Sequence, residues 1–120
     1  WFDSANAAPA VRAWTPAADI EESDSQYTVR LDVPGVSPDQ IEVRVEKNVL
    51  TMQGERAAST GESSRLTRVE RLQGRFVRQF RLPEVANGEA VEADYANGVL
   101  SIMIAKREAS QPRKIAIRVN

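Results

Sequence analysis

The sequence predicts an all-β protein folded as an antiparallel β-sandwich. Three observations carry this prediction: short segments alternate between apolar and polar residues, glycine, proline and asparagine separate these segments, and no segment with the helical period exceeds one turn. The chain has 120 residues, of which 42% are hydrophobic and 28% are charged, and this suits one globular core. We therefore expect one domain over residues 16–106 with a tail at each end.

The first residues do not share the alternating pattern. Residues 1–15 are rich in alanine and proline and contain Trp1, Phe2 and Trp14. Chain ends without a periodic apolar face are commonly mobile. We expect residues 1–15 to form a flexible arm with exposed aromatic side chains, and because the chain starts at Trp1 rather than at methionine we expect part of this arm to be missing.

The first half of the domain contains a strand followed by a hairpin. In residues 27–33 apolar and polar residues alternate, as in a strand with one buried face, and Pro34 and Gly35 end the pattern. Segments 41–45 and 49–52 alternate in the same way on either side of two turn residues. This spacing predicts a tight hairpin.

The second half repeats this arrangement. A strand over 75–82 ends at Pro83, and segments 91–96 and 99–104 flank Asn97 and Gly98. Asn-Gly is the strongest two-residue hairpin signal because both positions tolerate the positive φ of a type I′ turn. With the short segment described next, the count of seven or eight strands favours a sandwich.

A long polar connection lies between the two halves. Residues 56–64 read as a loop, and residues 66–71 regain some strand character. A strand this short is not stable by itself, and loop-closure entropy rises slowly with loop length, so donating it to a neighbouring subunit costs little. We expect a strand-swapped dimer, the alternative being a loop that is disordered in a monomer.

Arg78 is predicted to face an apolar side of its strand. It shares strand parity with Phe76, Phe80 and Leu82. A buried guanidinium without a partner is costly, whereas a fork-to-carboxylate pair at an interface offsets much of that cost. We expect Arg78 to be paired, the alternative being a side chain that extends into solvent at the rim of the sheet.

Residues 107–120 form a C-terminal extension. After a polar linker, Ile115, Ile117 and Val119 alternate with Ala116 and Arg118. An isolated strand cannot satisfy its own backbone, so we expect it to add to the edge of another sheet. The linker 106–114 spans about 30 Å when extended, which is enough to reach a second subunit; a tail folded back on its own domain is the alternative.

The composition argues against an enzyme. The chain has no histidine and no cysteine, which removes the common nucleophile triads and the usual zinc sites. The glycines are isolated from one another, and no phosphate-binding loop is present. The acidic residues Asp19, Glu21, Glu22 and Asp24 lack the spacing of a calcium loop. We expect no catalytic residues, no cofactor and no metal.

Charge and hydropathy exclude two further classes of partner. The net charge is −1, and the arginines over residues 65–81 occupy both a loop and a strand, so they do not form one stripe for nucleic acid. No apolar run approaches the roughly 20 residues that span a bilayer. We expect a cytoplasmic protein that is not associated with nucleic acid or membrane.

Four motifs together resemble the small heat shock proteins of the α-crystallin type, the Hsp20 family, in its bacterial and plant branch. Their order and spacing make the combination specific. The motifs are ADYANGVL at 93–100, GRFVRQFRLP at 74–83, VPGV at 33–36 with VL at 49–50 and GER at 54–56, and the terminal IAI at 115–117.

This resemblance implies an immunoglobulin-like β-sandwich, the α-crystallin domain, and a function. The function is that of an ATP-independent chaperone, a holdase that binds unfolding client proteins and prevents their aggregation as a homo-oligomer of strand-swapped dimers. The alternative is a monomeric p23-like co-chaperone adaptor of the same sandwich class. The long interrupted loop and the terminal IAI motif argue against the adaptor.

The resemblance also assigns site residues. It places Arg78 at a dimer interface, with Glu70 of the swapped loop as its candidate partner, and it makes Ile115 and Ile117 an oligomer anchor, although Ile117 and Val119 have the same spacing. The expected dimer interface is Leu66, Val69, Glu70 and Arg78, and the expected anchor groove is Ile41, Val43, Val45, Val91, Ala93 and Tyr95. From their place on the mobile arm, rather than from the resemblance, we expect Trp1, Phe2 and Trp14 to bind clients.

Overall fold

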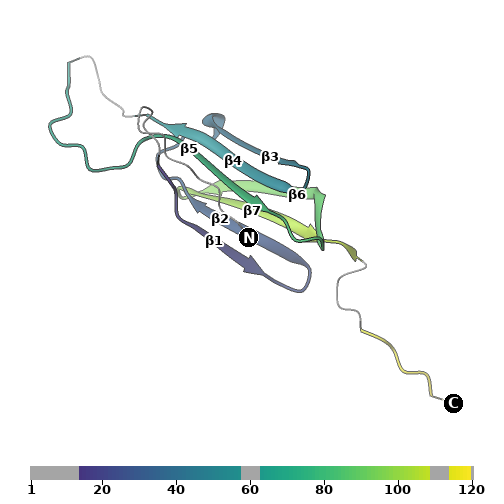
Figure 1. Ribbon diagram of the computed structural model, residues 1–120. Helices are drawn as coiled ribbons and strands as arrows, with labels where there is room; N and C mark the ends of the chain where they lie inside the picture. Colours follow the sequence, from purple (N-terminus) through teal and green to yellow (C-terminus); the bar gives the residue numbers. More distant parts are fainter. Residues whose placement is uncertain (1–13, 58–62, 109–113, 120) are drawn as a thin grey trace.

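Two antiparallel sheets lie face to face in the computed structural model, which describes residues 14–57, 63–108 and 114–119 (Figure 1). The four-stranded sheet has the order β1-β2-β7-β6 and the three-stranded sheet has the order β3-β4-β5. The strands are β1 (Ala18–Glu22), β2 (Gln26–Asp32), β3 (Ile41–Glu46), β4 (Val49–Arg56), β5 (Gly74–Arg81), β6 (Ala86–Ala96) and β7 (Val99–Lys106), with a 3₁₀ turn at Pro38–Gln40. The predicted all-β sandwich is confirmed.

Both predicted hairpins are present. Lys47 and Asn48 have φ values of 51° and 65°, and Asn97 and Gly98 have φ values of 54° and 77°. Positive φ at both central residues matches the right-handed twist of the flanking strands. The turn chemistry in the sequence therefore sets the register of β3 with β4 and of β6 with β7.

The core lies between the sheets and follows the predicted alternation. The inward-facing residues of β2, β4, β5 and β7 are almost completely buried. They include Val29, Leu31, Leu50, Met52, Phe76, Phe80, Leu100, Ile102 and Ile104. Burial of such side chains contributes about 1.5–3 kcal/mol each, so the sandwich needs no disulfide or metal.

One expectation about the N-terminal residues is wrong, and one strand of the domain was not predicted. Trp14 is only 8% exposed and packs edge-to-face on Phe76 with ring centroids 5.4 Å apart, so it belongs to the core rather than to a flexible arm. The acidic segment at 18–22 is a strand, β1, that pairs along its full length with β2. The alternating pattern is weak in β1 because only two of its residues, Ala18 and Ile20, are apolar and pack against the core.

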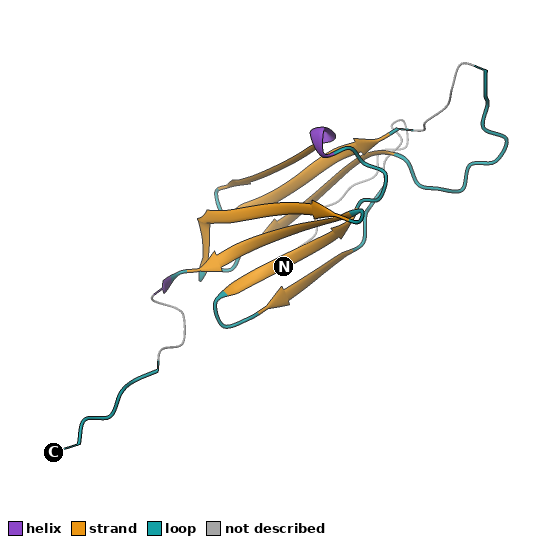
Figure 2. Ribbon diagram, turned by 180° about the vertical axis from the view of Figure 1, so that it is seen from behind, coloured by secondary structure: helices purple, strands orange, loops and turns teal. Residues whose placement is uncertain are grey.

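The segment 66–71 does not form a strand within its own subunit. It lies in an extended loop between β4 and β5 that projects from one end of the sandwich, whereas the C-terminal segment projects from the opposite end (Figure 2). Together they give the chain extents of 82 × 27 × 21 Å. The chain thus holds two extended segments away from its own core.

The sandwich leaves no room for a side chain at Gly54. A Cβ atom at Gly54 would lie 2.7 Å from the carbonyl oxygen of Gln40 and 2.9 Å from the Phe76 ring, and the carbonyl cannot rotate away as a side chain can. We expect Gly54→Ala to lower the free energy of unfolding by about 1–3 kcal/mol, as measured by urea denaturation. Gly88→Ala is the matched control, because its Cβ meets only the Val45 side chain at 3.1 Å. Equal stability of the two variants would contradict this account.

Candidate functional site

The six predicted groove residues lie on the two strands, β3 and β6, that end the two sheets on the same side of the sandwich. Ile41, Val43 and Val45 lie on β3, the edge of one sheet, and Val91, Ala93 and Tyr95 lie on β6, the edge of the other. All except Ala93 are partly buried against the core, and Ala93 is exposed. These apolar side chains lie on edge strands of opposite sheets and mark the position of the predicted groove.

Local contacts fix the position of β6 at this groove. The Tyr95 hydroxyl donates a hydrogen bond to the carbonyl oxygen of Val33 over 3.1 Å, which ties β6 to the end of β2. The register of β6 with β7 shifts between Ala86 and Val91. The first part of β6 then lies close to β3, because the Gly88 backbone approaches Val45.

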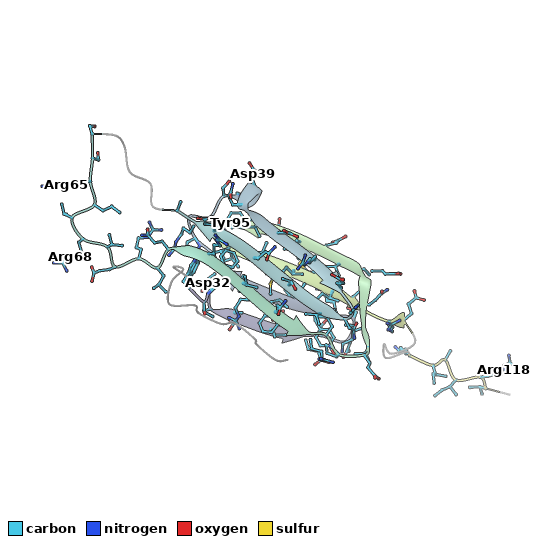
Figure 3. All side chains as sticks on the ribbon, turned by 45° about the horizontal axis from the view of Figure 1, so that its top comes forward. Asp32, Asp39, Arg65, Arg68, Tyr95 and Arg118 are labelled. Atoms are coloured by element: carbon cyan, nitrogen blue, oxygen red, sulfur yellow. The ribbon has the colours of Figure 1, made fainter. Side chains whose placement is uncertain are left out.

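The C-terminal segment does not occupy this groove in its own subunit. Ile115, Ile117 and Val119 are 80%, 88% and 88% exposed. Figure 3 labels Arg118 on this segment, well away from the sandwich. The segment is therefore not folded back on its own domain.

The apolar residues of the loop between β4 and β5 are also exposed. Leu66 and Val69 are 50% and 48% exposed, and Glu70 is also exposed. Arg65 and Arg68 lie at the far end of the loop in Figure 3. The predicted dimer residues of the loop thus share one projecting segment.

Arg78 is buried, as its strand parity predicted. Its side chain is 9% exposed and lies 4.9 Å from the centre of the Phe80 ring. Its Nη1 donates a hydrogen bond to the carbonyl oxygen of Pro16 over 2.6 Å. Arg78 therefore contacts residues 14–17, which we name the strap, and does not extend into solvent at the rim.

The strap connects the two sheets on the side opposite the groove. The backbone N–H of Trp14 donates to the carbonyl oxygen of Arg75 on β5, and the N–H of Asp32 on β2 donates to that of Ala17. The indole Nε1 of Trp14 donates to the carbonyl oxygen of Gly74 over 2.9 Å. The strap thus covers the start of the outer edge of β5.

A second buried arginine, Arg56, was not predicted from the sequence. It is 8% exposed, and its guanidinium stacks on the Trp14 ring at 4.3 Å from the centroid. Nη1 donates to the carbonyl oxygen of Pro34 over 2.8 Å, and Nη2 donates to that of Leu72. Burial, and secondarily the charge of nearby Arg71, lower the pKa of Arg56 from its usual value. Parity with Leu50 and Met52 on β4 was the signal available in the sequence.

A surface ion pair secures the edge strand β1. The Lys106 ammonium lies 2.7 Å from the Glu22 carboxylate, and the Lys106 side chain is 11% exposed. The hydrogen bond from Lys106 to Glu22 is the main cause that raises the pKa of Lys106. The pair joins the end of β1 to the end of β7.

The described residues offer neither a metal centre nor a membrane span. No group of three or more metal-ligating side chains is found in this part of the chain. Among the same residues no helix is long and apolar enough to cross a membrane.

A sandwich of seven described strands, with apolar residues on two edge strands, a projecting loop and a projecting tail, is the architecture of an α-crystallin-type domain. Residues 19–119 match the model of the Hsp20/alpha crystallin family, so the chain belongs to that family. Its members are non-enzymatic chaperones.

Relatives and solved structures agree with this assignment. The chain is 39% identical over 104 residues to the 16.9 kDa class I heat shock protein 1 of Triticum aestivum, covering 85% of this chain and 69% of that protein. It is 36% identical to small heat shock protein C4 of Rickettsia felis, covering 86% of this chain and 64% of that protein. The chain therefore spans about two thirds of the length of these relatives.

Two bacterial structures share the fold at substantial identity. A small heat-shock protein from Xylella fastidiosa, described as having a distinct high order structure, superposes with a TM-score of 0.74 at 38% identity, covering 88% of this chain and 98% of that one. The hspA protein of Xanthomonas axonopodis gives a TM-score of 0.70 at 41% identity, covering 78% and 95%. An oligomeric small heat shock protein is consistent with these neighbours.

Proposed function

We propose that the protein is an ATP-independent chaperone that binds unfolding client proteins and prevents their aggregation. One observation carries this proposal: the single subunit leaves apolar residues exposed on the loop and on the tail, and the apolar residues of its edge strands β3 and β6 are only partly buried. Apolar patches of this kind mark interaction sites. Because burial of apolar surface is non-directional, such a protein accepts many clients.

The first part of the proposed assembly is a dimer formed by exchange of residues 66–71. The outer edge of β1 is the acceptor, since β1 ends its sheet and has backbone groups available for another strand. The acidic residues Asp19, Glu21 and Glu22 lie on β1, whereas the loop carries Arg65, Arg68 and Arg71. This charge complementarity favours pairing between subunits.

The position of Arg78 supports the same dimer. Its bond to Pro16 places its guanidinium beside the strap, and the strap leads directly into β1. A loop strand paired with β1 would bring Glu70 of the partner subunit close to this guanidinium. We propose that this carboxylate forms a charge-assisted pair with Arg78.

The second part of the proposed assembly is docking of residues 114–119 into the groove of another subunit. Ile115 and Ile117, or Ile117 and Val119, are about 6.5–7 Å apart in a strand and fill neighbouring apolar positions. Lys114 and Arg118 flank these residues, and Glu42, Glu46, Glu92 and Asp94 are exposed on the two edge strands of the groove. Each docked tail stabilises the assembly by on the order of a few kcal/mol, so docking is reversible, and release of the tail exposes the groove.

The proposed client surfaces are the groove when empty and the N-terminal aromatic residues. Trp1 and Phe2 lie outside the described residues, and Trp14 is excluded because it is part of the core. We propose that the domain extends from Trp14 to Lys106, between an arm and a C-terminal extension. A cytoplasmic location fits a chain that has no cysteine.

The function is tested by light scattering from a heat-labile enzyme that aggregates when warmed. Because the chaperone captures apolar surface before clients meet each other, we expect an equimolar amount of this protein to suppress most of the scattering without ATP. A folded β-sandwich protein without tails serves as the control and should leave the scattering unchanged. A protein that stays monomeric and fails to suppress aggregation would instead support the adaptor.

A further inference from the structure

The donated segment has a competing acceptor within its own subunit. Residues 66–71 immediately precede β5, and β5 is the edge of the three-stranded sheet. Pairing within one chain is favoured by a high effective concentration. Exchange between subunits therefore requires that the loop be kept from folding back along its own β5.

Contacts of Trp14, Arg56 and Leu72, which we name the latch, lie at the start of this β5 edge. The strap occupies the start of the β5 edge, where the Trp14 N–H bonds to Arg75 and the Trp14 indole bonds to Gly74. Arg56 bonds to the carbonyl oxygen of Leu72 at the point where the loop returns to the sandwich. The guanidinium also stacks on Trp14, so a single buried side chain joins the strap to the returning end of the loop.

The latch also fixes the starting direction of the loop. Arg56 and Gly74 are paired in the β4–β5 register, so the loop leaves and returns at one point. The second bond of Arg56, to Pro34, holds the guanidinium against the turn after β2. Arg71 lies against the same turn, where its Nη2 is 3.2 Å from the position that a Gly35 Cβ would take. Beyond this root the loop extends away from the sandwich (Figure 1).

We propose that Arg56 is a positioning residue for strand exchange: by holding Leu72 and stacking on Trp14, it keeps residues 66–71 directed away from their own β5 and toward a partner. This inference rests on the proposed dimer. It assigns to Arg56 a role in association although Arg56 lies outside the donated segment. Preorganising a binding segment raises affinity because less conformational freedom is lost on binding.

The proposal predicts an asymmetry between donor and acceptor subunits. A chain lacking residues 65–71 accepts a strand on β1 but donates none, and it still contains Arg56 and Leu72. Arg56→Lys keeps the charge and the aliphatic stem but loses the two-pronged guanidinium. Placed in the donor, the substitution should weaken the mixed dimer; placed in the acceptor, it should not.

The experiment measures the affinity of this mixed dimer by fluorescence anisotropy. The chain has no cysteine, so Glu108→Cys allows one dye to be attached to the acceptor. Both partners carry Ile115→Ala and Ile117→Ala to suppress larger assemblies. With Arg56→Lys in the donor we expect about a tenfold higher dissociation constant, the loss expected for one charge-assisted hydrogen bond, and with the same change in the acceptor less than a twofold effect.

Two further donor variants distinguish an effect on the orientation of the loop from an effect on the stability of the fold. Trp14→Phe keeps a ring for Arg56 but removes the bond to Gly74, and it should weaken the mixed dimer by a smaller factor. Arg75→Lys changes an exposed residue at the same strand root and should have no effect. If Arg56→Lys weakens binding equally from either side, Arg56 is only structural and the proposal fails.

The two proposals fail in different ways. If the unsubstituted donor does not bind the deleted acceptor at all, strand exchange itself is wrong and the inference falls with it. If it binds but Arg56→Lys in the donor has no effect, strand exchange stands and the positioning role proposed for Arg56 is wrong.

Discussion

Deletion of residues 65–71 is expected to convert the dimer to monomers. In a symmetric exchange each dimer loses two strands, together with the burial of Leu66 and Val69, at about 1.5–3 kcal/mol for each fully buried side chain. Backbone hydrogen bonds to β1 add about 1 kcal/mol each. Losses of this size exceed what the remaining contacts of a small interface supply, so sedimentation equilibrium should show monomers at micromolar concentration.

Controls for this deletion distinguish the effect of losing the exchanged strand from the effect of shortening the loop. Replacing residues 65–71 with glycine and serine at constant length should also give monomers, because strand propensity and apolar side chains are lost together. Thr67→Ser should leave the dimer intact. Circular dichroism should still show a folded β-sandwich in all variants, since none of the deleted residues belongs to the buried core. An intact dimer after deletion would refute strand exchange.

Substitution of both Ile115 and Ile117 by alanine is expected to reduce large assemblies to dimers. Each tail loses most of its apolar contact with the groove, and this loss is repeated at every tail of the assembly. Because linked contacts reinforce one another through effective concentration, weakening all of them together disassembles the whole particle. Size-exclusion chromatography with light scattering measures the mass directly.

A companion variant decides the register of the tail. If Ile115 and Ile117 enter the groove, Val119→Ala should leave the assembly nearly unchanged; if Ile117 and Val119 enter, Ile115→Ala should be the silent variant. Val43→Asp on β3 should act like the double alanine substitution, because a carboxylate would lie in the apolar groove. Assemblies of unchanged mass after the double alanine substitution would count against the anchor.

Some side chains of the candidate site could be predicted from the sequence and others could not. Ile41, Val43 and Val45 were identifiable because a period of two places them on one face of a strand. Trp14 was not, because one aromatic residue in a proline-rich stretch has no periodic neighbours that indicate its surroundings. Arg56 was missed for a similar reason: parity indicates that it faces inward, but its partners Pro34 and Leu72 come from distant parts of the chain.

The sequence alone specifies six of the seven described strands and both hairpins, since alternation and turn residues such as Asn97 and Gly98 act over a few neighbouring residues. It also determined which segments are apolar yet have no partner nearby in the chain. Three features are found only in the folded structure: Trp14 closes the sandwich, the weakly patterned β1 forms its outer edge, and Arg56 contacts the returning end of the loop. These contacts depend on how the two sheets pack, because backbone carbonyls and ring faces from segments far apart in sequence meet only once the core has formed.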